Sequence, residues 1–298
     1  QVKRYTKITP TNASATGKFS FQQGNPIIRF TIAEADAYLL SPETRFQFKL
    51  FAQKDTASPS TTIKYNDNIN LNANIGASAV IQTLTISSRR YATSICEQIH
   101  NHNQLVSITH PALQSTRDCA TQRSHEYASV GNGILNREEL NQNYGAVKAN
   151  YTNVENLQRR FVACPTNGNG NVGWDCSIPL YCGMFMSENL DLRLLGGLEI
   201  EITLASDVAV FDNADNNTNY YLTDCVLNAP LLYKSQAELQ AGLSPSTFSF
   251  LSFTGLYNVC QSTNATITNK VGLRGALSMV QNSFQLNTLT IVERMVEV

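Results

Sequence analysis

The sequence is poor in charge. Charged residues make up 15% of its 298 residues, and the formal net charge at pH 7 is -1. The start of the chain offers only Lys3, Arg4 and Lys7 as a basic group, and no arginine-rich tail follows. Because a protein that wraps nucleic acid needs a basic patch to neutralise phosphates, we expect no direct binding of nucleic acid. A surface that is polar through Asn, Gln, Ser and Thr suits broad contact with neighbouring subunits, and equally suits a β-rich lectin.

Long apolar runs and catalytic motifs are lacking too. No apolar run approaches the length of a membrane span, and no secretory signal opens the chain. Neither the G-x-S-x-G motif nor a Cys-His signature of nucleophilic enzymes occurs. We therefore expect no membrane span, no enzymatic activity and no cofactor. The first residue is Gln1 rather than Met, which we interpret as a sign of a processed or trimmed chain.

The cysteines form no tight framework. An odd, scattered set predicts reduced thiols in a cytosolic compartment. The seven positions are Cys96, Cys119, Cys164, Cys176, Cys182, Cys225 and Cys260. None of the spacings among Cys164, Cys176 and Cys182 matches a C-x-x-C knuckle, so we interpret these three as small buried hydrophobes.

One group of metal-binding residue types stands out. All four histidines, His100, His102, His110 and His125, lie in one region with Cys96 and Cys119 nearby. Zinc prefers Cys and His at short spacings, and Cys96 and His100 share one face of a helix if the segment is helical. The other members have to fold back to join them. We interpret the group as loop and interface residues and predict no zinc requirement.

Other polar groups have plain explanations. The Gly168–Gly173 run lacks the flanking helix of a phosphate-binding loop, and it reads as a hairpin turn. Asp207, Asp212 and Asp215 follow an apolar strand, where a calcium site is possible but a solvated loop is favoured. Glu199 and Glu201 form a carboxylate pair of the kind used by glycosidases, yet they fit the polar face of a strand. The four Asn-x-Ser/Thr triplets, which we attribute to chance in an Asn-rich chain, begin at Asn12, Asn150, Asn216 and Asn264.

The clearest structural signal is alternation with a period of two. Leu198, Ile200, Ile202 and Leu204 alternate with polar residues, and a second run, residues 45–50, does the same. Alternation of this kind predicts a half-buried strand of an antiparallel sheet rather than a parallel one. The sequence therefore predicts an all-β fold, an antiparallel jelly-roll sandwich with one or two short helices and long loops.

The expected organisation is an N-terminal arm followed by one domain. Residues 1–25 have no apolar periodicity and are expected to form an irregular arm that lies on a neighbouring subunit, so deletion of residues 1–20 would leave the monomer folded. Residues 26–298 form a single jelly-roll domain with a long loop insertion at about 107–157. Helices are predicted at 93–106 and 235–241. Strands are predicted at 26–32, 45–53, 79–87, 159–164, 178–181, 197–205, 220–227, 248–260, 265–269, 276–280 and 286–296.

A family resemblance rests on four segments in order. They are Val80–Ile86 followed by a polar helix, Arg159–Phe161, Gly196–Ala205, and Tyr220–Leu227 leading into a short helix. Together they resemble single jelly-roll capsid proteins, penton or minor, of small eukaryotic DNA viruses of the virophage and polinton-like kind. The resemblance covers roughly residues 26–285. Major capsid proteins of those viruses carry two jelly rolls and are longer, and this chain departs from that pattern.

The resemblance implies a structural virion protein. The expected role is a homopentameric penton at the vertex of an icosahedral capsid, in contact with a neighbouring major capsid protein. The expected location is the virion, with assembly in the cytoplasm or nucleus of the host cell. The alternative is a carbohydrate- or receptor-binding jelly roll, with an aromatic platform built from Trp174, Tyr181 or the pair Tyr220 and Tyr221.

Overall fold

The structure is a computed structural model, and it divides the chain into two compact units, Gln1–Thr254 and Gly255–Val298. The first unit contains nearly all of the described elements. In the second, β14 (Asn282–Gln285) pairs antiparallel with β15 (Arg294–Glu297). The residues that the structure describes are 2–12, 17–22, 25–54, 61–62, 71–72, 75–90, 95–113, 166–167, 170–171, 173–186, 189–211, 218–240, 250, 252–253, 282–285 and 294–297.

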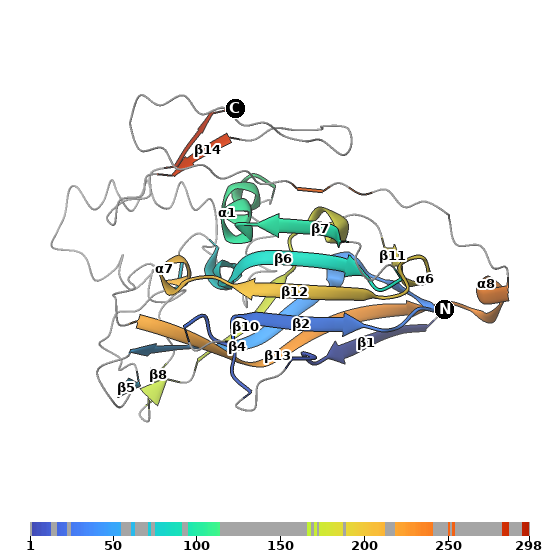
Figure 1. Cartoon of the computed structure of the whole chain (residues 1–298), viewed down its shortest axis with the longest axis horizontal. Coiled ribbons are helices and arrows are strands. Elements are labelled where there is room, and N and C mark those ends of the chain that lie inside the picture. Colours follow the sequence, from blue (N-terminus) through green and yellow to red (C-terminus); the bar gives the residue numbers. More distant parts are fainter. Residues whose placement is uncertain are drawn as a thin grey trace. The chain divides into compact units, whose positions relative to one another are not determined.

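Two antiparallel sheets form the first unit. In the larger sheet the strand order is β10-β4-β13-β3-β11, with β1 paired to β13 and β5 paired to β4. Its strands are β1 (Val2–Ile8), β3 (Ala37–Leu39), β4 (Arg45–Lys54), β5 (Thr61–Thr62), β10 (Trp174–Pro179), β11 (Leu190–Asp191) and β13 (Thr218–Tyr233). The smaller sheet has the order β2-β12-β6-β7, which Figure 1 shows side by side. Its strands are β2 (Ile27–Ile32), β6 (Ile81–Ser88), β7 (Ile95–His100) and β12 (Leu198–Leu204).

The strand pairs are nested in the sequence. Strand β1 pairs with β13, β2 with β12, β4 with β10, and β6 with β7, all antiparallel. Each pair lies inside the previous one along the chain, and the pairs alternate between the two sheets. A long hairpin that is rolled up in this way is a jelly roll. The predicted fold class is therefore confirmed.

Besides the two sheets, the first unit contains short helices and one hairpin. The 3-10 helices are η1 (Ser41–Glu43) and η2 (Gly76–Val80), and the α-helices are α1 (His102–Leu113), α5 (Gly183–Met186), α6 (Leu192–Leu195), α7 (Asp207–Val210) and α8 (Gln236–Gln240). The glycine-rich run forms the expected hairpin, in which β8 (Thr166–Asn167) pairs with β9 (Gly170–Asn171). The helix predicted at 235–241 corresponds to α8.

The core lies between the two sheets. Ile200 and Ile202 of β12 are fully buried, as the alternation predicts, and they pair with residues of both β2 and β6. The sheets meet through aromatic contacts such as that of Phe30 with Phe46, whose ring centroids are 5.7 Å apart in an edge-to-face arrangement. Apolar burial of this extent is the main stabilising contribution to the fold.

A pair of glycines connects α6 to β12. Gly196 ends α6 with a φ of 63°, and Gly197 follows with a φ of 95°. A Cβ atom on Gly197 would lie 2.3 Å from the carbonyl oxygen of Ile32, so no other residue fits there without displacing β2. Gly197 thus lets the backbone of this turn lie directly against β2.

The prediction of an irregular arm at residues 1–25 is wrong for the first part of that segment. Residues Val2–Ile8 form β1 and pair along Leu227–Tyr233 of β13, and Phe19 forms a bridge with Leu222 of the same strand. Most of β1 is exposed on both faces, which explains why its sequence shows no apolar periodicity. The first strand thus belongs to the jelly roll itself.

The predicted helix at 93–106 is also wrong for its first half. Residues 95–100 form β7, and the helix α1 begins at His102. Ile95 and Ile99 are four residues apart, a spacing that fits one face of a helix and equally one face of a strand. Of the insertion expected at 107–157, residues up to 113 belong to α1 and the remainder lies outside the described residues. The strands predicted at 159–164, 265–269 and 276–280 lie there too.

Candidate functional site

A buried carboxylate lies at the free edge of the smaller sheet. Glu97 of β7 is only 4% exposed. Its Oε1 accepts hydrogen bonds from the backbone N–H of Gly183 at 3.0 Å and of Phe253 at 3.1 Å, and its Oε2 accepts one from Met184 at 2.8 Å. Three N–H donors compensate the carboxylate for the water that it loses on burial. Glu97 therefore ties β7 both to α5 and to the segment around Phe253.

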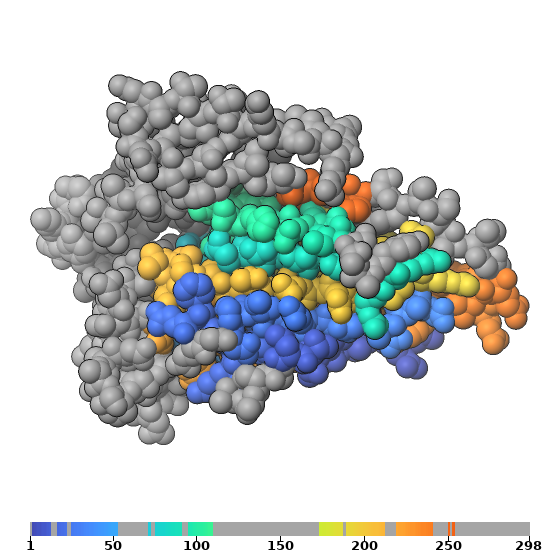
Figure 2. All heavy atoms as spheres, viewed as in Figure 1, coloured from blue at the N-terminus to red at the C-terminus, as the bar shows by residue number. Residues whose placement is uncertain are grey.

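The segment that reaches Glu97 from later in the chain carries two aromatic side chains. Phe250 and Phe253 are partly buried and pack against the main hydrophobic core. Figure 2 shows these residues as a small orange group beside the green atoms of β7 and α1. Residues 250, 252 and 253 have no regular secondary structure, and the packing of their aromatic side chains and the bond to Glu97 contribute to holding them on the sandwich.

Sequence reasoning missed Glu97, although a signal was present. Alternation along a strand puts residues 97 and 99 on one face, so Glu97 shares its face with the buried Ile99, whereas the bulge at Cys96 turns Ile95 to the exposed face. A charge at such a position indicates a buried and hydrogen-bonded group. The mistaken helix removed that signal, because residues two apart do not share a helical face.

A second buried polar group is His102 at the start of α1. Its ring is 0% exposed, and its Nε2 lies 2.8 Å from the carbonyl oxygen of Tyr181. Since a carbonyl oxygen only accepts, Nε2 carries the proton and Nδ1 is the bare nitrogen, which has no hydrogen-bond partner among the described residues. Burial lowers the pKa of His102 to about 4, against the smaller raising effect of the bond to Tyr181. The ring is therefore neutral at physiological pH.

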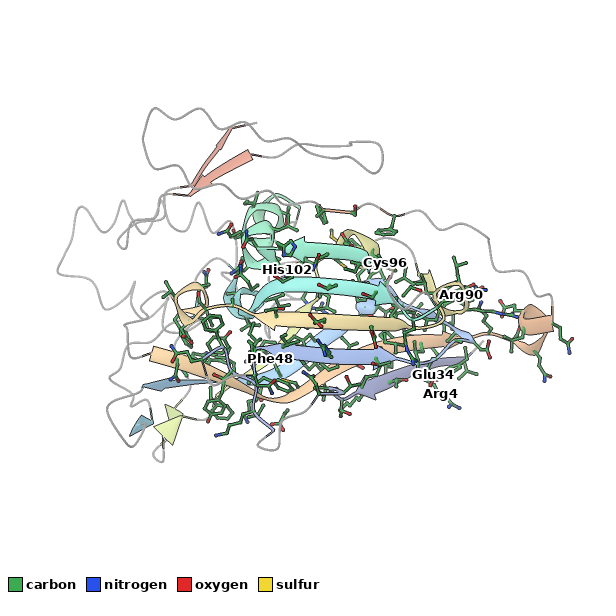
Figure 3. All side chains as sticks on the ribbon, in the orientation of Figure 1. Arg4, Glu34, Phe48, Arg90, Cys96 and His102 are labelled. Atoms are coloured by element: carbon green, nitrogen blue, oxygen red, sulfur yellow. The ribbon has the colours of Figure 1, made fainter. Side chains whose placement is uncertain are left out.

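The predicted histidine and cysteine group is not assembled by the described residues. Cys96 and His100 both lie on β7, where four residues span roughly 13 Å, too far apart for two ligands of one zinc ion. Figure 3 places Cys96 near the start of β7 and His102 at the start of α1. The side chain of His110, together with Cys119 and His125, lies outside the described residues. Among the described residues, no group of three His, Cys, Asp or Glu side chains is arranged to hold a metal ion.

The described cysteines Cys96, Cys176, Cys182 and Cys225 form no disulfide bond. Burial raises the pKa of Cys176 and of Cys182 well above the usual value, so both remain protonated. Both belong to the main hydrophobic core, as predicted for small buried hydrophobes. Cys164 lies outside the described residues.

Two of the carboxylates singled out by the sequence, Asp207 and Glu201, have structural partners. Asp207 begins α7, and its Oδ2 accepts a hydrogen bond from the Gln22 side chain at 2.7 Å, while Asp212 and Asp215 lie outside the described residues. On the outer face of the smaller sheet, Glu201 forms an ion pair with Arg29 at 2.7 Å. Glu199 is exposed on the same face. The structure thus favours the interpretation of Glu199 and Glu201 as residues of a polar sheet face over that of a glycosidase carboxylate pair.

A buried ion pair anchors the far end of β13. Lys234 lies 2.7 Å from both carboxylate oxygens of Asp191, and the two side chains are only 4% and 9% exposed. The Asp191 carboxylate also accepts the N–H of Arg193 at 2.9 Å and so caps α6. The Lys234 ammonium lies 4.5 Å from the centre of the Tyr38 ring.

The aromatic residues considered for a carbohydrate platform are already covered. Trp174 and Tyr220 are each 1% exposed and belong to the core. The Tyr221 ring is stacked on Phe51 at 5.0 Å, and the Lys18 ammonium lies 4.3 Å from its centre. Tyr181 is partly buried against the cluster of Ile75, Ala79 and Val106. Trp174 and Tyr220 therefore have no exposed ring for a sugar to stack on, and Tyr181 and Tyr221 are partly buried.

Exposed apolar side chains lie along two lateral edges of the sandwich. Strand β1, at one edge of the larger sheet, exposes Val2 by 58% and Tyr5 by 63%. Strand β7 lies at the outer end of the smaller sheet, and there Ile95 is 51% exposed. The chain crosses from the larger to the smaller sheet between β1 and β2, at one lateral side of the sandwich. It crosses back between β7 and β10, at the other side. Strands β1 and β7 therefore lie on opposite sides of the jelly roll. The two sides thus present different surfaces.

The comparisons with known proteins add a structural likeness. No protein-family model matches the chain, and no curated protein matches it. Among solved structures, the chain is similar to the crystal structure of mavirus major capsid protein, with a TM-score of 0.39 and 11% sequence identity. The match covers 81% of this chain and 48% of that chain, so this chain spans about half the length of the protein it matches. Among the described residues no helix has the length and apolarity to span a membrane.

Proposed function

We propose that this protein is a structural virion protein, a single jelly-roll capsid subunit that assembles side by side with copies of itself. The observation that carries the proposal is the nested order of the strand pairs, from β1 with β13 to β6 with β7. Jelly rolls of this order serve as building blocks of viral capsids, and also of lectins. The sequence resemblance to single jelly-roll capsid proteins favours the first use.

The buried ionisable groups support a scaffold rather than a catalyst. The carboxylate of Glu97 accepts three backbone N–H groups, and Asp191 is paired with Lys234. His102 is bound to a carbonyl oxygen and is neutral, and the thiols of the core stay protonated. Each of these buried groups makes contacts that hold strands and helices together. The described buried groups therefore serve the fold.

The finer proposal is a homopentamer at an icosahedral vertex, in contact with a larger major capsid protein. A closed ring of identical subunits needs a heterologous interface, in which one patch meets a different one. The β1 side with Val2 and Tyr5 and the β7 side with Ile95 satisfy this requirement, because they lie on opposite sides of the jelly roll. The ring then forms part of the virion, with assembly in the cytoplasm or nucleus of the host cell.

Native mass spectrometry and negative-stain images of the purified chain test the proposal. A ring of five copies, or incorporation into particles with the major capsid protein, is the expected result. Replacing Val2 and Tyr5 by Ser should shift the equilibrium toward monomers, because it removes apolar surface from one side of the interface. The matched control is Val208→Ser, since Val208 is 70% exposed on α7, away from both lateral edges.

The alternative, a carbohydrate-binding module, makes the opposite prediction. A monomer that binds sugars on a glycan array would contradict the capsid proposal. The covered faces of Tyr221 and the burial of Trp174 and Tyr220 speak against that outcome.

A further inference from the structure

Strand β1 leaves one of its two edges without a partner. Its residues, Val2–Ile8, pair with β13 in a continuous antiparallel register, and Figure 1 shows the two strands side by side. Among the described residues, no backbone hydrogen bond reaches the other edge of β1. Alternate residues of an antiparallel strand direct their N–H and C=O groups to that edge. The strand therefore presents unused donors and acceptors to whatever lies beside it.

The adjacent edge of the smaller sheet is closed by the chain itself. Strand β2 is the end strand of that sheet on the β1 side of the jelly roll. The carbonyl oxygen of Arg29 accepts the N–H of Thr11 at 2.8 Å, and the N–H of Arg29 donates to the Asn12 side chain at 2.8 Å. The Asn12 side chain also donates to the carbonyl oxygen of Ile27 at 2.7 Å. On this side of the sandwich, the edge of β2 is thus covered at these residues and the edge of β1 is open.

The charged side chains of β1 are all positive. Lys3 forms an ion pair with Glu43 at 2.7 Å, whereas Arg4 and Lys7 have no acidic partner among the described residues. Both of these cations are exposed. Opposite charges on adjacent strands stabilise their pairing, and like charges destabilise it. The open edge therefore favours a strand that carries carboxylates.

A second copy of the chain does not supply such a strand from its described residues. If two β1 strands paired antiparallel about their midpoints, Lys3 of one would lie opposite Lys7 of the other, and the like charges would repel. Strand β7 has one carboxylate, Glu97, which is buried. Strand β10 has one exposed carboxylate, Asp175, which lies 3.6 Å from the Lys49 ammonium. The chemistry of β1 thus fits a strand from a different protein.

We propose that β1 binds an extended acidic segment of another protein, which joins the larger sheet as a further antiparallel strand. Strand addition of this kind gains affinity from main-chain hydrogen bonds and specificity from side chains. Arg4 and Lys7 are three positions apart, so they lie on opposite faces of β1. The segment that fits them has two carboxylates three positions apart and an apolar residue opposite Tyr5, which is 63% exposed.

This inference goes beyond the proposed capsid role. On a single chain the segment binds the open edge of β1, and neither a ring nor a vertex is needed for that contact. In a ring, the added strand lies in the seam between the β1 side and the next subunit. Binding and ring formation are therefore separate measurements.

Synthetic peptides test the proposal on the full chain. The probe is the fluorescently labelled, C-terminally amidated peptide TETVETV, which places a carboxylate opposite Lys7 and Arg4 and an apolar side chain opposite Tyr5. Fluorescence anisotropy should show saturable binding, and the charge-reversed peptide TKTVKTV should bind about tenfold more weakly. Hydrogen exchange at the outward N–H groups of β1 should slow when TETVETV is present. Lack of saturable binding at millimolar peptide would overturn the inference.

Two N-methylated forms of the peptide test the backbone contact. Methylation at the odd positions and methylation at the even positions remove N–H donors from opposite edges of the peptide. A paired strand should tolerate one of these patterns and lose most of its affinity with the other. Equal affinities would show that charge alone attracts the peptide, which would contradict strand addition.

Two variants of the protein provide the internal comparison. Lys7→Glu reverses the charge of an exposed side chain on β1, so TETVETV should bind about tenfold more weakly. Arg89→Glu makes the same change at an exposed position just after β6 and should leave the affinity unchanged. Equal losses in the two variants would contradict recognition by β1. Thermal unfolding shows whether either loss comes from a change in folding.

Native mass spectrometry of the same samples separates this inference from the proposed function. Rings whose chains bind no peptide would overturn strand addition and leave the capsid proposal standing. Monomers that bind the peptide would support strand addition and contradict the ring. Dimers whose β1 N–H groups exchange slowly without peptide would show that a second copy occupies the edge, and would overturn the inference.

Discussion

Ile202 shows at the level of one side chain how the sandwich is stabilised. It is 0% exposed and sits in β12 between Ile28 of β2 and Leu84 of β6. Replacing it by Asp buries an unpaired carboxylate, and we expect the free energy of unfolding to fall by roughly 4 kcal/mol. Urea denaturation measures the loss. The control is Thr203→Asp, which puts the same carboxylate on the half-buried outer face of the strand. Equal stability of the two variants would contradict the strand orientation.

His102 makes the stability depend on pH. Its pKa is lowered from 6.5 to about 4 in the folded protein, because burial disfavours the charged ring. Between these values the unfolded chain binds a proton that the folded chain does not, so stability falls as the pH decreases from 6.5 to about 4. The contribution lost is about 3 kcal/mol at the lower limit. Unfolding free energies at pH 7.5, 5.5 and 4.5 measure it.

The control for the pH dependence is His102→Gln. Gln keeps an N–H that reaches the Tyr181 carbonyl oxygen, and it does not titrate. The difference in stability between wild type and variant should therefore change with pH in the stated range. A constant difference would show that His102 is not the group responsible.

At the scale of whole elements, β13 and α6 are joined by the ion pair of Lys234 and Asp191. Removing only the cation, with Lys234→Met, leaves a buried carboxylate without its partner and should cost roughly 3–5 kcal/mol. The comparison is Lys3→Met, which breaks the exposed pair with Glu43 and should change stability little. Thermal unfolding of both variants decides whether burial of the pair matters as expected. Similar melting temperatures would contradict it.

Strand β1 gives a prediction that reverses the expectation from sequence. Because β1 pairs along β13 and Phe19 bridges the same strand, deletion of residues 1–20 should destabilise the monomer. Point variants make the test gentler. Ile8 packs against the core and Lys7 points to the other face, so Ile8→Asp should lower the unfolding free energy more than Lys7→Asp. If the truncated chain had wild-type stability, residues 1–20 would be a dispensable arm after all.

The amphipathic strands were predictable, and the ambiguous ones were not. Strands β4, β6, β12 and β13 have one buried and one polar face, so their period of two is visible in the sequence. Strand β1 is exposed on both faces and carries no such signal. In β7, Ile95 and Ile99 fit helix and strand alike. The hydrogen bonds of Glu97 join it to residues 86 and 156 positions away, and single-sequence patterns do not report such contacts.

For the molecule as a whole, the nested strand order also fixes a sequence of events during synthesis. The innermost pair, β6 with β7, has both members within residues 81–100 and can close early. Val2 of β1 meets Tyr233, so β1 leaves the ribosome long before its partner strand has been made. Such long-range closure makes folding slow. During that wait, Lys3, Arg4 and Lys7 keep β1 charged and so protect the nascent chain from pairing with the wrong strand.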